Sequence, residues 1–292
     1  MKKRTRPRGF VPYDPRPNAL VLIDATRGVL DEYRDHLPLT LRQVFYRAVS
    51  ASVIGKTESD YARLCEVLGR ARRGHLLPMD AFRDDGFRCD DPPGWNGADH
   101  FLHNVGCWID DFTLDRQHGQ DTRLVVWCEA QGMVPQLQRV AHEYSVRVLS
   151  SGGFDSITAK HAQAKEIAGD GRPTVILHIG DHDPSGVHLH GSLDEDVRAF
   201  AAHYGGRCSS PRLAVTPEQV EHYRLPTAPP KATDRRAFTG QTTQCEALAP
   251  DVLAGIVREA IEQRQDAETR RAVIEQEHHE RERLRERLGR VA

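Results

Sequence analysis

An alternation of apolar strand candidates with helix candidates in the middle of the chain constrains the fold more than any other feature. The apolar runs are Leu124–Trp127, Val146–Leu149 and Val175–Ile179. Helical stretches near Val134–Tyr144 and Asp155–Ala168 separate these runs. Parallel strands need long crossover connections, which are usually helices, whereas antiparallel strands can be joined by short turns. The alternation therefore predicts an α/β fold with a parallel sheet.

Acidic residues directly follow two of these strand candidates. Glu129 comes after the first run, and Asp181 and Asp183 come after the third. Because the carboxyl ends of parallel strands meet at one edge of a sheet, the three carboxylates are expected to converge there. Carboxylate oxygens are the ligands that Mg²⁺ prefers, so these residues are candidate metal ligands. For Asp183, which precedes Pro184, the alternative is a cap on the next helix.

The N-terminal part of the chain predicts three helices. The first runs from Asn18 to His36, the second begins at a capping box headed by Thr40, and the third is capped by Thr57. The second helix has one apolar stripe, formed by Leu41, Val44, Phe45, Ala48 and Val49. Two short helices joined by a turn resemble a helix-turn-helix, and the segment His75–Asn96 is the expected wing.

Arg42 and Tyr46 lie on the second helix, away from its apolar stripe. Tyr46 is about 130° from the centre of the stripe, so its ring need not belong to the core. The two residues are four positions apart, so a guanidinium can sit beside a phenol and a bound phosphate and lower the cost of a phenolate. The alternative is a half-buried tyrosine that packs under the wing.

Charge is divided unevenly along the chain. The net charge is only -2, but residues 1–83 hold 16 Lys and Arg against 9 Asp and Glu, a net charge of +7. The other 209 residues hold 24 against 33, a net charge of -9. A basic front part fits binding to a polyanion such as nucleic acid, and an acidic rear part fits a site for metal cations.

The third predicted helix carries basic residues opposite its apolar face. Arg63 and Arg70 are seven positions apart, and Lys56, Arg72 and Arg73 are close to them in the sequence. A helix of this kind can enter a DNA groove and contact phosphates, so the five residues are candidate DNA-binding residues. The alternative is a face that is only solvated.

Several other classes of protein and site are disfavoured. The six cysteines, Cys89 among them, contain no C-x-x-C pair, which argues against disulfide frameworks and cysteine-rich zinc sites. The four histidines near the acidic residues fit no zinc motif; they are His178, His182, His188 and His190. No apolar run approaches the ~20 residues of a membrane span, and the basic N-terminus lacks the apolar segment of a secretory signal. The expected compartment is the cytoplasm.

Helix-breaking residues between Asp84 and Gly97 predict a domain boundary. The predicted divisions are a DNA-binding domain at 1–90, an α/β domain at 98–250 and a charged helical tail at 251–292.

Taken together, these motifs resemble the A subunit of the type IIB DNA topoisomerase, topoisomerase VI, and its meiotic double-strand-break relatives. The segments that carry the resemblance are Leu41–Tyr46, Trp127–Glu129 and Gly180–Gly186. The nearest likeness is to the short versions called Mini-A, and it covers roughly Asn18 to Ala254. This chain departs from the family pattern directly after Glu129: many relatives have a charged residue there, and this chain has Ala130.

The resemblance implies a winged-helix domain followed by a Toprim domain, which has a Rossmann-like sheet. It implies that Tyr46 attacks a DNA phosphodiester and leaves a 5′-phosphotyrosyl link, with Arg42 as the supporting cation. It further implies that Glu129, Asp181 and Asp183 bind Mg²⁺. The family acts as a homodimer in which the tyrosine of one subunit works against the metal of the other, together with a separate ATPase B-type subunit.

Three other functions fit parts of the sequence. A Toprim nuclease would use water in place of Tyr46 as the nucleophile. A non-catalytic DNA-binding relative would bind DNA without any need for Glu129 or Asp181. A haloacid-dehalogenase-like phosphotransferase would use Asp181 as the nucleophile, but Pro184 and Ser185 stand where that class has a small apolar residue and a threonine.

Overall fold

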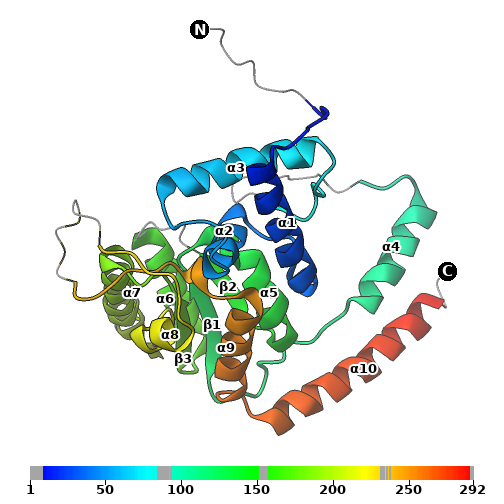
Figure 1. Ribbon diagram of the computed structural model, residues 1–292. Coiled ribbons are helices and arrows are strands. Elements are labelled where there is room, and N and C mark those ends of the chain that lie inside the picture. Colours follow the sequence, from blue (N-terminus) through cyan, green and yellow to red (C-terminus); the bar gives the residue numbers. More distant parts are fainter. Residues whose placement is uncertain are drawn as a thin grey trace.

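The chain folds into an α/β body flanked by a unit of three N-terminal helices, and two further helices project from the other side (Figure 1). The computed structural model describes residues 9–83, 92, 94–150, 157–230, 234, 236 and 238–289. Most of the predicted boundary at 84–97 and the thiol of Cys89 lie outside these residues. The other five cysteines are free thiols, as the sequence predicts.

The N-terminal unit consists of α1 (Pro17–Glu32), α2 (Leu41–Ser50) and α3 (Glu58–Arg73). Thr40 heads the predicted capping box of α2, with its side-chain oxygen accepting from the Gln43 amide at 3.2 Å. Thr57 caps α3 in the same way. These caps bind amide groups that have no partner within their helix, so they fix where each helix begins. The three predicted helices are confirmed.

The expected wing remains a prediction. Residues 75–83 form turns and one isolated parallel bridge between Leu39 and Phe82, and these nine residues contain no hairpin. Residues 84–91 and 93, which make up much of the predicted wing, lie outside the part of the chain that the structure describes.

A parallel sheet forms the centre of the α/β body, as the alternation predicts. Its order is β2-β1-β3-β4, with β5 also paired to β3, and every pair is parallel. Cys128 at the end of β1 is in register with Ile179 at the end of β3, so the two strands end side by side. The strands are β1 (Arg123–Cys128), β2 (Arg147–Ser150), β3 (Thr174–Ile179), β4 (Cys208–Ser209) and β5 (Arg212–Ala214).

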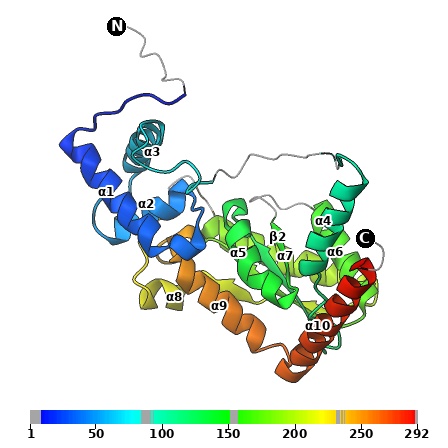
Figure 2. The ribbon, with the colours of Figure 1, turned by 90° about the vertical axis from the view of Figure 1, so that its right-hand side faces the viewer.

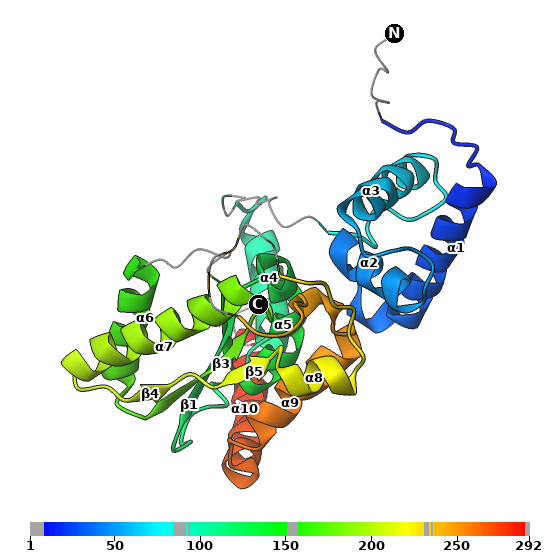
Figure 3. The same cartoon turned by 60° about the vertical axis from the view of Figure 1, so that its left-hand side comes forward.

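Helices cover both faces of the sheet (Figure 3). On one face α5 (Val134–Ala141) and α9 (Pro250–Glu262) pack in the main apolar core. On the other face α6 (Ile157–Asp170) and α7 (Pro184–His203) form a second core. Helix α7 begins at Pro184, because Asp183 caps it and proline suits a first helical turn.

The region predicted as a tail divides into two parts with different roles. The first part, α9, has an apolar face buried in the core, whereas α10 (Ala267–Gly289) projects beside α4 (Ala98–Asp110) (Figure 2). Near the middle of α10, Glu277 is 1% exposed and pairs with Arg116 and Arg281. The remaining helix, α8 (Pro217–His222), follows β5. Among the described residues, no helix has the length and apolarity needed to cross a membrane.

Candidate functional site

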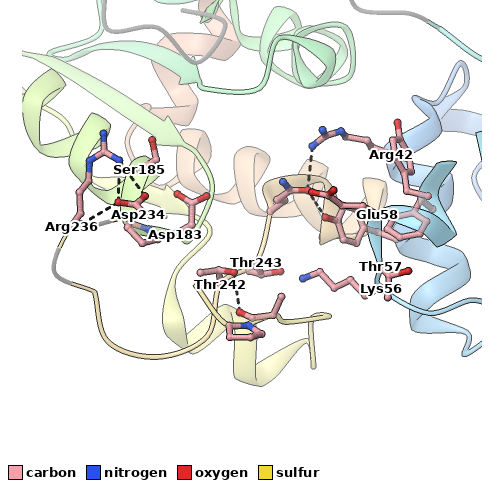
Figure 4. A pocket seen from close by; sticks show the side chains of 17 residues that line it. Arg42, Lys56, Thr57, Glu58, Asp183, Ser185, Asp234, Arg236, Thr242 and Thr243 are labelled. Atoms are coloured by element: carbon pink, nitrogen blue, oxygen red, sulfur yellow. Dashed lines mark hydrogen bonds and ion pairs between the residues drawn. The ribbon is translucent and has the colours of Figure 1, made fainter. Parts of the chain in front are cut away.

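A pocket of about 500 Å³ lies between the N-terminal unit and the start of α7. Figure 4 shows Asp183 and Ser185 on one side of it and Arg42 and Lys56 on the other. Residues of the segment before α9 complete the wall. The lining residues central to the site are Arg42, Tyr46, Lys56, Asp183, Thr243 and Gln244.

Tyr46 reaches this pocket from α2, and its hydroxyl donates a hydrogen bond to Oε1 of Gln244. The ring is only 4% exposed, so it is more buried than its position off the apolar stripe indicates. Contacts from outside α2 explain the difference: Gln244 is 198 positions away in the chain, and Nζ of Lys56 lies 5.6 Å from the ring centroid. Burial, followed by the nearby carboxylate of Glu246, raises the pKa of the Tyr46 phenol well above its ordinary value.

Arg42 lies one helical turn before Tyr46, as the sequence predicts, and contacts the same glutamine. Its Nη1 donates to Oε1 of Gln244 at 3.2 Å, and its guanidinium carbon lies 5.8 Å from the centroid of the Tyr61 ring. The two residues predicted to act together thus share one acceptor atom. A cation next to a phenol favours the phenolate, which opposes the effect of burial.

The predicted acidic edge is formed by Glu129 after β1 and Asp181 after β3. Oε2 of Glu129 accepts a hydrogen bond from the Asp181 amide at 3.3 Å. Burial and the charge of Asp181 raise the pKa of Glu129 to about 7. A Cβ on Gly180 would lie 2.6 Å from Oε2 of Glu129, and one on Gly186 would lie 2.2 Å from the Asp181 carbonyl oxygen. A side chain at position 180 would therefore displace the Glu129 carboxylate, and one at position 186 would collide with the backbone of Asp181.

Asp183 caps α7, in agreement with the alternative interpretation of this residue. Its Oδ1 accepts from the Gly186 amide at 2.7 Å, while the residue also lines the pocket. One of its carboxylate oxygens is therefore engaged by the backbone.

Asp181 belongs to a group of three potential ligands with Cys245 and Glu246. The ligand atoms of these residues lie within 4.8 Å of one another, and the Cys245 amide donates to Oδ1 of Asp181 at 2.9 Å. Within the described part of the chain, neither Glu129, Asp183 nor any histidine belongs to such a group. Burial raises the pKa of both Asp181 and Glu246. The charge of Asp183 raises the pKa of Asp181 further, and the charge of Asp181 raises that of Glu246. Two carboxylates this close repel when ionised, so the donor set fits a divalent cation.

Arg212 at the start of β5 shapes the loop between β3 and α7, and sequence reasoning missed it. The guanidinium donates to the carbonyl oxygens of Gly180 at 3.0 Å, Gly186 at 3.2 Å and Val215 at 3.0 Å. It also donates to the carbonyl of Asp181. These bonds fix the backbone that carries the acidic edge. Sequence reasoning likewise missed Gln244, Cys245 and Glu246, which follow no strand and form no motif.

Two of the five predicted DNA-binding residues, Arg63 and Arg70, are exposed on α3. Arg63 contacts the carbonyl of Asn18 at 3.4 Å, and the guanidinium of Arg70 lies 4.8 Å from the centroid of the Tyr13 ring. The guanidinium groups of both residues lie at the surface, where a phosphate can reach them.

The other three predicted DNA-binding residues make contacts within the protein. Lys56 donates to the carbonyl of Pro226 at 2.7 Å and lines the pocket. Arg72 lies over the ring of Phe82 at 4.9 Å, and Arg73 donates to a backbone carbonyl of the N-terminal segment at 2.9 Å. Contacts within the protein thus fix the positions of these three basic side chains.

Comparisons of the chain with protein-family models, with curated proteins and with solved structures found no match.

Proposed function

We propose that this protein is a Mg²⁺-dependent, DNA-cleaving transesterase of the topoisomerase VI A type. The observation that carries the proposal is the pocket itself. It brings a tyrosine hydroxyl and two cationic side chains together with Asp183, and the buried carboxylates of Glu246 and Asp181 lie near enough to act on the tyrosine electrostatically. A phosphodiester with a bound divalent cation has the charges that suit both sides of this pocket.

In the proposed reaction Tyr46 Oη attacks phosphorus, and the bond from phosphorus to the 3′ oxygen breaks. The leaving 3′ oxygen gains the proton that the phenol gives up, and the DNA stays bound as a 5′-phosphotyrosyl ester. Because one ester replaces another, the reverse reaction can reseal the strand. Arg42 and Lys56 bind the phosphate and oppose the negative charge that builds up on it.

Glu129, Asp181, Asp183 and Glu246 are the residues that would hold the cation. When bound there, Mg²⁺ supplies Lewis-acid polarisation of the scissile phosphate. Their oxygen donors suit this hard ion better than the Cys245 thiol does. Arg212 keeps the carboxylates in position through its bonds to the backbone of the loop.

The fold is consistent with the family in outline. We assign α1–α3 to a winged-helix domain and the parallel sheet with its helices to a Toprim domain. A homodimer places two such centres on one duplex, so that each copy cuts one strand, and a separate ATPase subunit of the B type would be needed for strand passage.

The test is covalent capture of DNA. Parental protein is incubated with supercoiled DNA and Mg²⁺ and quenched with denaturant, and DNA that moves with protein is measured. We expect Tyr46→Phe to form no adduct while it still folds and binds DNA, because it lacks only one oxygen. Tyr61→Phe is the matched control, since Tyr61 lines the same pocket and its variant should still form the adduct.

A Toprim nuclease is the second candidate. The observation that favours it is the buried, hydrogen-bonded phenol of Tyr46, whose raised pKa opposes ionisation. If Tyr46→Phe cuts DNA as fast as the parental protein, water is the nucleophile and the transesterase proposal is wrong.

A further inference from the structure

Two buried thiols lie beside the acidic edge, and the proposed function uses neither of them. Cys128 ends β1, Cys245 begins a short 3₁₀ helix at Cys245–Ala247, and both residues are fully buried. The Cys245 thiol forms a hydrogen bond with the Cys128 thiol, so the two sulfur atoms are neighbours, although both thiols are free. The two residues stand far apart in the sequence, so only the fold brings them together.

Two carboxylates lie close to the same sulfur. Sγ of Cys245 donates to Oε2 of Glu246 at 3.6 Å, and one ligand atom each of Asp181, Cys245 and Glu246 lie within 4.8 Å of one another. A Zn²⁺ ion holds sulfur at about 2.3 Å and carboxylate oxygen at about 2.0 to 2.2 Å, so ligand atoms on one ion lie no more than roughly 4.6 Å apart. The three ligand atoms therefore need to move only slightly to hold one ion.

The charges at this place favour a cation. The negative charges of Glu246 and Asp181 raise the pKa of the Cys245 thiol, as burial does. Glu246 is only 8% exposed, and it forms no ion pair with a cationic side chain of the described residues. Three buried acidic groups thus hold protons that a divalent cation can replace.

We propose that Asp181, Cys245 and Glu246, with the Cys128 thiol as fourth donor, form a site for a thiophilic divalent cation such as Zn²⁺. Two sulfur and two oxygen donors match the four ligands of a tetrahedral Zn²⁺ site. Mg²⁺ takes oxygen ligands and keeps several waters, so thiols this deeply buried do not suit it. The inference rests on the proposed function in one respect. Asp181 and Glu246 are also the proposed Mg²⁺ ligands, so a bound thiophilic ion should compete with Mg²⁺ and stop DNA cleavage.

Cobalt absorbance tests the site without relying on activity. The full chain is freed of metal with a chelator, the chelator is removed, and Co²⁺ is added, whose bonds to thiolates absorb in the near ultraviolet. We expect this absorption to saturate at one Co²⁺ per chain, and added Zn²⁺ to abolish it by displacement. Cys107→Ser, which changes an exposed cysteine on α4, is the matched control and should absorb like the parental protein. No absorption in the parental protein, or equal absorption in Cys245→Ser, would overturn the proposal.

Substitution of single donors tests which residues bind the ion. We expect Cys245→Ser and Glu246→Gln each to bind Zn²⁺ at least about 10-fold more weakly in calorimetry, since loss of even an indirect partner of a metal costs about 10- to 100-fold. Cys128→Ser should lose part of the cobalt absorption and keep the rest. Circular dichroism shows which variants fold. Glu246→Gln keeps both thiols and nearly the same shape, so it decides the question if Cys245→Ser does not fold. Unchanged Zn²⁺ affinity in folded Glu246→Gln would overturn the proposal.

Competition with Mg²⁺ connects this site to the proposed function. At saturating DNA and Mg²⁺, we expect Zn²⁺ to lower adduct formation by the parental protein, and Cys245→Ser to need about 10-fold more Zn²⁺ for the same fractional loss. If adduct forms and Zn²⁺ inhibits both proteins alike, the ion acts elsewhere and the proposal is wrong. If the cobalt absorption appears while the parental protein yields no adduct, the metal site stands and the proposed function fails.

Discussion

The two sides of the pocket carry opposite charges and are built in different ways. On one side α2 and the turn before α3 present Arg42 and Lys56. Arg42 donates a hydrogen bond to the side chain of Gln244, and Lys56 donates one to a backbone carbonyl. On the other side Asp183 lines the pocket, and close to it lie the buried carboxylates of Glu129, Asp181 and Glu246, whose pKa values burial raises. Arg42 and Lys56 donate their hydrogen bonds to uncharged oxygens, while the buried carboxylates raise one another's pKa although Arg212 and Arg42 lie near them.

This difference indicates what kind of ligand fits. An anion alone would suit Arg42 and Lys56 but would be repelled by the carboxylates, and a cation alone would show the reverse preference. A phosphate with a divalent cation satisfies both sides together. The predictions below separate the contributions of the two sides.

Substitutions on the acidic side of the pocket should have the largest effect on adduct formation. We expect Asp181→Ala to lower adduct formation by on the order of 10³-fold or more, because charge stabilisation by a metal contributes several kcal/mol to such reactions. Calorimetry should show weaker Mg²⁺ binding, and the circular dichroism spectrum should stay unchanged. Asp121→Ala, at an exposed position outside the pocket, is the control. Unchanged Mg²⁺ affinity in Asp181→Ala would mean that the acidic edge holds no cation.

Substitutions on the cationic side of the pocket should have a smaller effect on adduct formation. We expect Arg42→Ala to slow adduct formation about 10²- to 10³-fold, as the loss of other preorganised charge stabilisers does. Single-turnover rates at saturating DNA measure this directly, with Arg63→Ala as a matched control on the outer face of α3. Loss of DNA affinity with an unchanged rate would instead assign Arg42 to binding.

Much of the fold follows from local patterns in the sequence. The caps Thr40 and Thr57 act within one helical turn, and each buried strand is a continuous apolar run, so both are visible in the sequence. The convergence of Glu129 and Asp181 also follows, because parallel strands must end at one edge.

The rest of the site depends on contacts that span the chain. Gln244 meets Tyr46 across 198 positions, and Glu246 joins Asp181 although it follows no strand. No periodicity or spacing in the sequence predicts these contacts, since they result from how the segment Thr242–Ala247 packs between α2 and the sheet. The burial of Tyr46 has the same cause, which explains why helical geometry alone predicts too much exposure.

The acidic side should also respond to pH. In protein freed of divalent cations, the pKa of Glu129 is raised from its usual 4.5 to about 7, so its protonated form is favoured in the folded state. This stabilisation is fully present below pH 4.5 and is lost as the pH rises through about 7. Melting temperatures in chelator should therefore fall over this range, and less steeply in Glu129→Gln. The raised pKa values of Asp181 and Glu246 act in both proteins. Parallel profiles for the two proteins would show that Glu129 does not titrate in this way.

The smallest effect is expected outside the pocket, on the exposed face of α3. If Arg63 and Arg70 contact phosphates, replacing both with Ala should reduce the salt slope of DNA binding by about one to two units, since each neutralised phosphate contributes close to 0.9. The measurement is the logarithm of the DNA association constant against the logarithm of salt concentration. Adduct formation at saturating DNA should stay near the parental rate, because neither residue lines the pocket. An unchanged slope would mean that this face is only solvated, and that the positive charge that binds DNA is confined to the pocket side of α2 and α3.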